Sequence, residues 1–244
     1  QPMYARPMLP DLIGGVEPDK VFGVGEAFPA DSFELIVDPA VALDCAAREV
    51  SCASGRVVHY DALLLATGCA PRRGDWAGAE AAGIHYFRSF ADAQAIARAA
   101  EEARHAVVIG GGLLGLEFVR AFHMRGLPTT LLVRGDTVGA PGLDRDSGAI
   151  IHQALLDWGV EVALEEEATG FEVRDGRVSA VHTSAGRTIA CEVVGVAIGV
   201  QPRVELARQA GLQVDPGVVV DDRLRTSAPE VYAAGDVAQV YDIG

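Results

Sequence analysis

Residues 106–117 read AVVIGGGLLGLE, and this stretch decides the fold. Four apolar residues run into Gly110, and Gly112 and Gly115 complete a G-x-G-x-x-G spacing. An amphipathic segment with apolar residues at helical intervals follows at once, which predicts a strand, a tight turn and a helix. The first glycine of such a motif makes the turn, the second lets the backbone approach a pyrophosphate, and the third lets the helix pack on the strand.

The start of the expected helix, at Leu113 and Leu114, presents N–H groups that have no partner inside the helix, and such groups suit an anion. The stretch therefore predicts a dinucleotide site. A glycine-rich turn without a ligand is the alternative that the bare motif leaves open. No lysine followed by serine or threonine stands where a P-loop needs it, which disfavours a nucleoside triphosphate site.

The segments around the motif supply the context that a dinucleotide fold requires. A second strand is expected at 129–133, after a stop at Gly126 and Pro128, and it completes a βαβ unit with strand 106–109 and helix 113–125. The flanking elements are expected as a helix at 92–103, a helix from 147 to 159, a strand at 160–163, an antiparallel meander at 171–173, 178–182 and 188–191, and a buried strand at 193–198.

Other elements lie on either side of this region. Residues 4–10 are proline-rich and irregular, and a modest helical pattern covers 11–16. Residues 69–75 have the composition of a connection between domains. The remaining expected elements are strands at 33–37 and 62–66, short extended pieces within 41–58, a helix at 204–210, and strands at 218–220 and 230–234.

Composition limits the classes of function. The chain has 244 residues, 50% of them hydrophobic, and a net charge of −14 from 34 acidic and 20 basic residues. Because no Lys/Arg cluster is present, a nucleic acid is a poor partner. No apolar run approaches the roughly 18 residues of a membrane span, and no signal-peptide pattern is present. The four cysteines form neither C-x-x-C nor a metal-ligand spacing. We expect a soluble, cytoplasmic protein without a metal site.

Four motifs together resemble one family. They are Ala66-Thr67-Gly68, the glycine motif, residues 197–202 (AIGVQP), and residues 226–236, which end in YAAGD. Their order and spacing, over nearly the whole chain, are similar to those of the FAD-dependent pyridine nucleotide-disulfide oxidoreductase superfamily. Residues 4–7 (YARP) and 113–117 (LLGLE) look most like the branch that holds the flavin domain of NAD(P)H nitrite reductase large subunits together with ferredoxin and rubredoxin reductases.

The resemblance implies an α/β protein with two Rossmann-like dinucleotide-binding domains. Residues 1–73 and 201–244 are expected to form a discontinuous FAD-binding domain, and residues 75–200 an NAD(P)-binding domain inserted in it. In the family a first G-x-G-x-x-G, for the FAD pyrophosphate, precedes the YARP segment. We find none here and expect the FAD domain to lack its N-terminal βαβ unit. On that expectation the chain is a fragment or an incomplete form of a longer flavoprotein and binds FAD weakly.

The resemblance also implies roles for residues on the flavin side. Asp236 matches the aspartate that hydrogen-bonds the flavin ribityl chain, and Gly235 matches the glycine that lets the chain approach it. Ala66, Thr67 and Gly68 match a turn that passes near the FAD. Without the resemblance, a Gly-Asp pair after a strand is more often a helix N-cap.

Further residues are implied to bind or position the cofactors. Arg6 and Pro7 match the segment beside the isoalloxazine, and Glu117 matches the glutamate near the nicotinamide in ferredoxin-reductase-like members. Glu117 is also favourable simply as a negative charge near the start of a helix. Gly199 lies in the AIGVQP motif and is expected to line the cofactor site.

Two departures from the family pattern matter. No cysteine motif stands near residues 4–9, where members with a thiol relay carry one, and this disfavours disulfide reduction. An acidic residue for the adenosine ribose is expected after the second strand, where this chain has Arg134. Arg134 either meets a 2′-phosphate, which favours NADPH, or is a solvated surface arginine.

The resemblance implies hydride transfer from NAD(P)H to FAD, with electrons passed to a redox partner protein or domain outside this chain, similar to the nitrite reductase large subunits. No residue here is arranged to ligate haem, iron–sulfur or sirohaem groups. The alternatives are a ferredoxin or rubredoxin reductase, an NAD(P)H oxidase and, from another class, a non-catalytic nucleotide-binding module. The terminal acceptor and the oligomeric state stay open.

Overall fold

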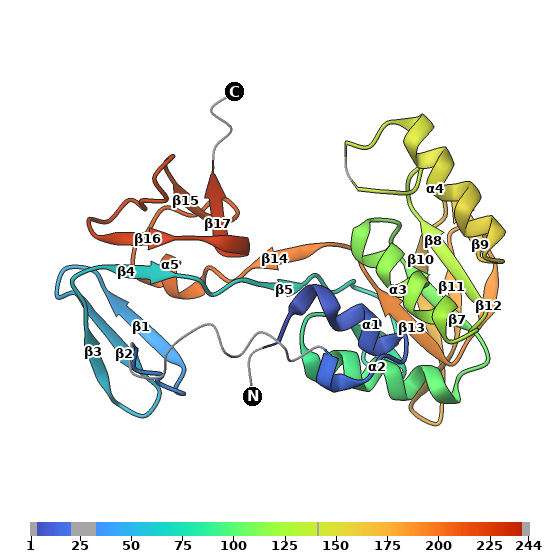
Figure 1. The fold of residues 1–244 in the computed structure, drawn as a ribbon, viewed down its shortest axis with the longest axis horizontal. Helices are drawn as coiled ribbons and strands as arrows, with labels where there is room; N and C mark the ends of the chain where they lie inside the picture. Colours follow the sequence, from blue (N-terminus) through green and yellow to red (C-terminus); the bar gives the residue numbers. More distant parts are fainter. Residues whose placement is uncertain (1–3, 21–32, 141, 241–244) are drawn as a thin grey trace. The chain divides into compact units, whose positions relative to one another are not determined.

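The computed structural model describes residues 4–20, 33–140 and 142–240. The chain divides into two units. Unit 1 comprises Gln1–Phe28 and Pro71–Gly199, and unit 2 comprises Pro29–Ala70 and Val200–Gly244. The two segments where the chain passes between the units, β5 (Cys69–Pro71) and β14 (Val200–Pro202), pair as a two-stranded ribbon (Figure 1).

A five-stranded parallel sheet forms the centre of unit 1 (Figure 1). Every neighbouring pair of strands is parallel, with Val108 opposite Leu131 in the register. Strands that are buried on both faces read as continuous apolar runs, and this is how the sequence signals them. The strands lie in the order β6 (Ile84–Tyr86), β13 (Val193–Val196), β7 (Ala106–Ile109), β8 (Thr129–Val133) and β9 (Glu161–Leu164).

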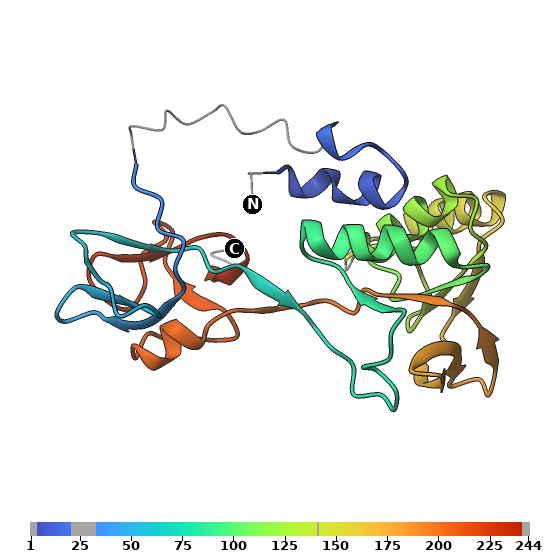
Figure 2. The same ribbon diagram turned by 90° about the horizontal axis from the view of Figure 1, so that it is seen from below.

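Helices cover one face of this sheet and an antiparallel meander covers the other, as Figure 2 shows. On β7, Val108 packs among residues of the helices, whereas Val107 and Ile109 pack against the meander, and all three are at most 5% exposed. The helices and the meander strands match the sequence predictions within a few residues. They are α2 (Phe90–Glu102), α3 (Leu113–Met124), α4 (Arg145–Asp157), β10 (Ala168–Arg174), β11 (Arg177–Thr183) and β12 (Thr188–Ala190).

The N-terminal segment 4–20 belongs to unit 1. It contains η1 (Arg6–Met8), α1 (Leu9–Ile13) and η2 (Pro18–Lys20). Leu9 and Ile13 are fully buried, and α1 packs on α2 and α3. This differs from the expected assignment of residues 1–73 to the flavin domain, because the apolar side chains of α1 find their partners on the helices of unit 1.

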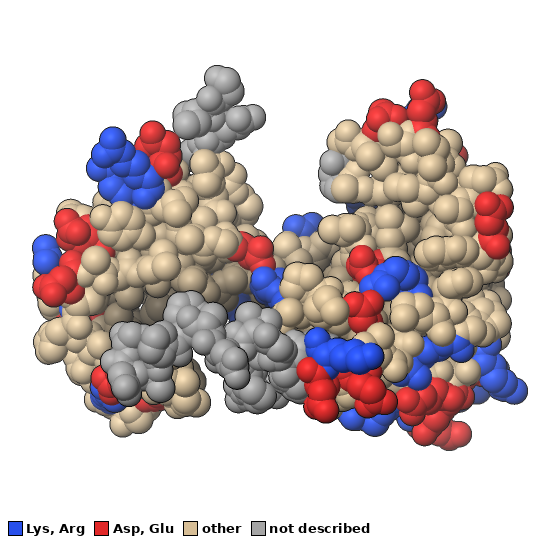
Figure 3. Space-filling view, in the orientation of Figure 1, with Lys and Arg blue, Asp and Glu red and all other residues tan. Residues whose placement is uncertain are grey.

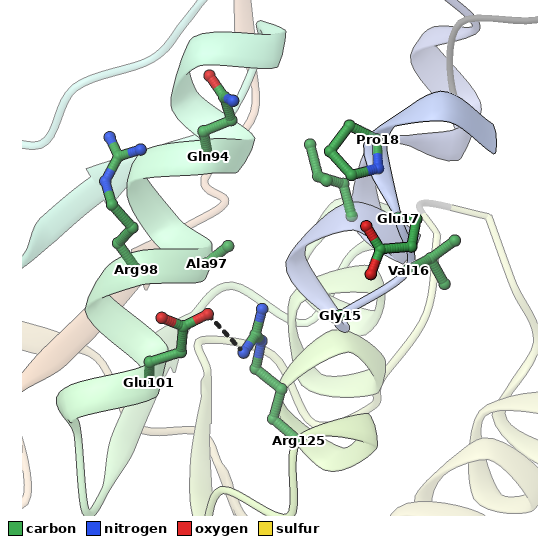
Figure 4. A pocket seen from close by; sticks show the side chains of 10 residues that line it. Gly15, Val16, Glu17, Pro18, Gln94, Ala97, Arg98, Glu101 and Arg125 are labelled. Atoms are coloured by element: carbon green, nitrogen blue, oxygen red, sulfur yellow. Dashed lines mark hydrogen bonds and ion pairs between the residues drawn. The ribbon is translucent and has the colours of Figure 1, made fainter.

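A pocket of about 350 Å³ lies where this segment meets α2 and the end of α3 (Figure 4). Arg125 borders it, donates from Nε to the carbonyl oxygen of Ile13, and lies with Nη1 3.3 Å from Oε1 of Glu101. Because this guanidinium and this carboxylate already neutralise each other, the pocket offers no clear charge preference. No residue of the glycine motif lines it.

Unit 2 consists of small sheets around its own core, which includes Leu65, Val218 and Val231. β4 pairs in parallel with β16, so that residues about 170 positions apart in the sequence become neighbours. Besides β14, the described elements of unit 2 are β1 (Ala40–Asp44), β2 (Glu49–Cys52), β3 (Val57–His59), β4 (Leu63–Leu65), α5 (Glu205–Gln209), β15 (Val218–Val220), β16 (Val231–Ala233), η4 (Gly235–Val237) and β17 (Ala238–Val240).

The strand predicted at 33–37 is wrong. These residues form neither helix nor strand, and Leu35 and Val37 are 75% and 91% exposed. A strand needs a neighbour to take up its backbone hydrogen bonds, and none of the described strands pairs with this segment. The run of apolar residues alone was therefore a misleading signal.

On the face drawn in Figure 3, acidic and basic side chains of the described residues are interspersed. Within residues 4–20, 33–140 and 142–240, no helix is both long and apolar enough to cross a bilayer. In the same ranges no group of three or more His, Cys, Asp and Glu residues is placed to hold a metal ion.

Candidate functional site

The glycine turn after β7 has the geometry that its sequence predicts. Gly110 has φ of +111°, a region that favours glycine, and a Cβ there would lie 2.3 Å from the carbonyl oxygen of Ala197. A Cβ at Gly115 would lie 1.8 Å from the carbonyl oxygen of Gly110. A side chain at either position would clash with the protein backbone. The protein's own packing therefore requires these two glycines, which let the start of α3 and the residue after β13 lie directly against the turn.

Gly112 differs from the other two glycines. Its backbone is extended, with φ of −76° and ψ of −176°, and a Cβ there would meet no heavy atom within 4 Å. Protein packing therefore does not require glycine at this position. The space beside it is open, which is the property that a close approach by a ligand requires.

The same residue is the N-cap of α3, a helix of 12 residues, and it has no side chain to accept from the first turn. The other two long helices of unit 1 are capped: Ser89 accepts from the N–H of Asp92 at α2, and Asp144 accepts from that of Ser147 at α4. The uncapped start at Leu113 and Leu114 therefore offers N–H groups to an anion. The residues present fit a dinucleotide pyrophosphate.

The other predicted nicotinamide-side residues lie around this turn. Gly199 has φ of +104° and accepts from the N–H of Arg72 at 2.9 Å, shortly after β13, the strand beside β7. Arg134 follows the last residue of β8 and is exposed, and no partner for it occurs among the described residues. Asp136, two residues on, forms an ion pair with Arg145.

Glu117 lies one turn into α3, beyond the uncapped N–H groups. Its side chain is 34% exposed, and its Oε2 accepts from Nε of Arg120 at 3.0 Å. Nη2 of Arg120 in turn lies 2.8 Å from Oδ1 of Asp11 on α1. The carboxylate predicted to lie near the nicotinamide is thus held by a neighbour one turn along the helix.

In unit 2 the predicted flavin-side residues come together at the carboxyl ends of β4 and β16. The Thr67 hydroxyl donates to the carbonyl oxygen of Arg203 at 2.8 Å, and the N–H of Arg203 donates to Gly68 at 2.9 Å. Gly235 has φ of +76° with nothing within 4 Å of a Cβ, so both its conformation and its surroundings suit a close approach. Ligands of parallel sheets bind at this end of the strands, and the turn fits a flavin chain.

Cys69 lies beside Asp236, although no cysteine motif in the sequence pointed to a role for it. Its Sγ lies 3.4 Å from Oδ2 of Asp236, to which the thiol donates. Ala66 is exposed, directly after β4, within the same group of residues. Arg6 and Pro7 are exposed in η1 and belong to unit 1, so the structure does not group them with Thr67 and Asp236.

Arg120 and Asp11 were also missed by the sequence analysis. The spacing of Glu117 and Arg120, three residues apart on a predicted helix, was a usable signal for a side-chain pair. Asp11 lies more than 100 residues away from Arg120 in the sequence, and only the packing of α1 on α3 brings the two together.

Two of the thiols, Cys191 and Cys45, are not activated for redox chemistry. None of the four cysteines is in a disulfide. Burial raises the pKa of the Cys191 thiol to about 12, and burial also raises the pKa of Cys45 above its ordinary value. Since the thiolate is the reactive form, neither thiol is activated for exchange at neutral pH.

Two curated proteins are similar to this chain over about four fifths of its length. The ferredoxin–NAD(+) reductase component of the biphenyl dioxygenase system of Paraburkholderia xenovorans (strain LB400) is 41% identical over 196 residues, covering 80% of this chain and 48% of that protein. The NAD(P)H nitrite reductase of Bacillus subtilis (strain 168) is 30% identical over 199 residues, covering 82% of this chain and 25% of that protein.

A solved structure, the ferredoxin reductase for the CYP199A2 system from Rhodopseudomonas palustris, matches with a TM-score of 0.92 at 32% identity, covering 98% of this chain and 60% of that one. The predicted α/β class and Rossmann-like fold are confirmed. The chain spans about half the length of the curated relatives it matches. A family model described as pyridine nucleotide-disulphide oxidoreductase matches residues 3–243, and the chain belongs to that family.

Proposed function

We propose that this protein is an FAD-dependent oxidoreductase that takes a hydride from NAD(P)H and passes the electrons to a redox partner protein or domain. The observation that carries the proposal is the open space beside Gly112 at the uncapped start of α3. Backbone N–H groups at a helix N-terminus bind phosphate groups, and the missing Cβ lets a pyrophosphate approach them closely.

Unit 1 is proposed to bind the nicotinamide cofactor. Gly110 and Gly115 shape the turn, and the N–H groups of the residues from Leu113 onward bind the pyrophosphate. Glu117 lies one turn further along α3 and orients the nicotinamide end, and Gly199 lines the site beside β7. In this assignment the backbone binds the phosphates and Glu117 positions the reacting ring.

Unit 2 is proposed to bind the flavin. Asp236 holds the ribityl chain, Gly235 and the Thr67-Gly68 turn leave room for it, and Cys69 orients the aspartate. The assignment of Arg6 and Pro7 to the isoalloxazine end rests on the sequence resemblance alone, because these residues belong to unit 1. When bound, NAD(P)H supplies the hydride and FAD accepts it, and the protein's residues contribute position and distance.

The acceptor is proposed to be a protein electron carrier of the ferredoxin or rubredoxin kind. The support is the 41% identity to a ferredoxin–NAD(+) reductase component and 35% identity to a rubredoxin–NAD(+) reductase of Pseudomonas putida. A nitrite reductase partner domain is the second candidate, supported by the 30% identity over 82% of this chain. A cytoplasmic location is proposed because the cysteines form no disulfide.

The proposal is tested by recording the visible spectrum of the purified protein with excess FAD present during anaerobic titration with NADH. We expect NADH to bleach the flavin absorption bands, and the bands to return when a ferredoxin or rubredoxin is added. A protein that binds NADH but does not bleach the flavin would be a non-catalytic nucleotide-binding module. Rapid re-oxidation by O₂ alone would favour an oxidase.

The preference between the two nicotinamide cofactors is proposed to depend on Arg134. The variant Arg134→Ala should lower the affinity for NADPH by about tenfold and leave the affinity for NADH nearly unchanged. The reason is that only NADPH has a 2′-phosphate that can form a charge-assisted hydrogen bond. Dissociation constants for both cofactors, measured by calorimetry, check this. Equal effects on both would mean that Arg134 is a solvated surface residue.

A further inference from the structure

The guanidinium of Arg120 has an acceptor for each of its three nitrogens. Nε lies 3.0 Å from Glu117 on the same helix, and Nη2 lies 2.8 Å from Asp11 on α1. Nη1 lies 3.5 Å from Sδ of Met124. The guanidinium is a rigid planar fork, so three acceptors on three sides determine its orientation completely.

This arrangement is not needed to hold α1 in place. Leu9 and Ile13 are fully buried against α2 and α3 and already dock the helix. The ion pair that links α3 to α1 joins Arg120 and Asp11, whose side chains are 35% and 22% exposed, and ion pairs between partly exposed side chains contribute little to stability. The hydrogen bond to Asp11, and with it that to Glu117, raises the pKa of Arg120, so the guanidinium is charged throughout the working pH range.

The position of Asp11, Arg120 and Glu117 beside the start of α3 suggests a role for these three residues besides stability. Glu117 lies one turn beyond the uncapped start of α3, and the next turn carries Arg120. A free glutamate that is 34% exposed, as Glu117 is, samples several rotamers, whereas a carboxylate bonded to a fixed guanidinium samples few. Asp11 on α1 is the residue outside α3 that fixes the orientation of the Arg120 guanidinium.

We propose that Arg120 is a positioning residue for the nicotinamide end of the cofactor. It holds the Glu117 carboxylate in one orientation, and Asp11 holds Arg120, so that α1 helps to set the geometry at the start of α3. This inference rests on the proposed function, in which Glu117 faces the nicotinamide ring.

The test compares two ligands that share the pyrophosphate and differ in the nicotinamide. NADH and ADP-ribose are titrated calorimetrically into this protein, wild type and variants, and the ratio of their dissociation constants reports the nicotinamide contribution. We expect Arg120→Met to raise the dissociation constant of NADH by about tenfold. The dissociation constant of ADP-ribose should stay within about twofold of the wild-type value, because the glycine turn is unchanged. The variant Glu117→Gln should change the ratio similarly, and the double variant should lose no more than Glu117→Gln alone.

Matched variants separate positioning from structural damage. Arg98→Met removes an exposed arginine from α2 and should leave the ratio unchanged. Arg120→Lys keeps the charge but lacks the planar guanidinium, and it should give a ratio between those of the wild type and Arg120→Met. Asp11→Asn should change the ratio in the same direction as Arg120→Met, by a smaller factor. Tryptophan fluorescence during unfolding, which reports on unit 1 through Trp76 and Trp158, verifies that each variant is folded.

Three results would overturn the inference. They are an equal loss of NADH and ADP-ribose in Arg120→Met, an unchanged ratio in folded Arg120→Met or Glu117→Gln, and additive losses in the double variant. If the wild type binds NADH and ADP-ribose but the ratio does not respond to Arg120, only the positioning role fails. If the wild type binds neither ligand, the proposed function fails with it.

Discussion

The two units bury their parallel strands in different ways. In unit 1, every residue of β7 is at most 5% exposed, because helices cover one face of the sheet and the meander covers the other. In unit 2, Leu64 in the middle of β4 is 57% exposed, and among the described strands only β16 pairs with β4. Unit 1 thus completes its own core, and its glycine turn rests on a sheet that needs nothing from unit 2.

The units also differ in how far apart their paired segments lie in the sequence. β7 and β8 are joined by one helix and pair with Val108 opposite Leu131. In unit 2, Leu65 pairs opposite Ala233, across the whole of the inserted segment. Because β7 and β8 pair locally, we expect the proposed nucleotide site of unit 1 to form without the long-range pairing of β4 with β16.

The largest effect is expected where unit 1 is most tightly packed. Gly115→Val places side-chain atoms where a Cβ would already lie 1.8 Å from the carbonyl oxygen of Gly110. The backbone has to move, and we expect a loss of about 3 kcal/mol or more in the free energy of unfolding. Urea denaturation followed by tryptophan fluorescence checks this. A stability close to that of the wild type would show that α3 does not pack on the turn as described.

A smaller effect should separate the two ways of burying strands. Leu131→Ala in β8 empties a fully buried position and is expected to cost about 2–5 kcal/mol, whereas Leu64→Thr in β4 should cost less than about 0.5 kcal/mol. Hydrogen exchange read by mass spectrometry assigns each change to its own unit. If Leu64→Thr proves as costly as Leu131→Ala, this side chain is buried in the protein as it exists in solution and the contrast between the units disappears.

The smallest effect is a pH dependence of unit 1. Burial lowers the pKa of His85, Arg177 lowers it further, and Asp92 opposes both, while Nε2 is buried without a partner among the described residues. The unfolded chain then binds a proton that the folded chain does not, so stability is lost as pH falls below about 6.5. In His85→Gln the slope between pH 7 and 5 should be shallower, by at most about 1.4 kcal/mol per pH unit. Identical slopes would mean that His85 titrates normally.

The elements of unit 1 could be predicted from sequence because each of them is encoded locally. Strand 106–109 and strand 129–133 were predicted with the bounds that the structure has, since apolar runs and glycine stops define them. The strand predicted at 33–37 was wrong because strand formation depends on a pairing partner, which no local pattern reveals. The grouping of α1 with unit 1 depends on tertiary burial of Leu9 and Ile13, and the sequence alone assigned it to the other domain.

In the candidate site, too, locally encoded features could be predicted from sequence and long-range contacts could not. The glycine spacing predicted both the turn and the distinct requirements of Gly110, Gly112 and Gly115, because backbone conformation and sterics follow from residue type. The contact of Asp11 with Arg120 and that of Cys69 with Asp236 join residues that are distant in sequence. Such pairs appear only when the fold brings the elements together. The assignments of Glu117, Arg134 and the flavin-side residues to cofactor atoms remain predictions.

The most direct test of the central claim compares Gly112→Val with the wild type in calorimetric titration with NADH. A Cβ at Gly112 meets no protein atom within 4 Å, so the variant should unfold at nearly the same denaturant concentration as the wild type. Its side chain fills the space that a pyrophosphate needs, and we predict that NADH affinity falls by at least about a hundredfold. A folded Gly112→Val protein that binds NADH as tightly as the wild type would contradict the account.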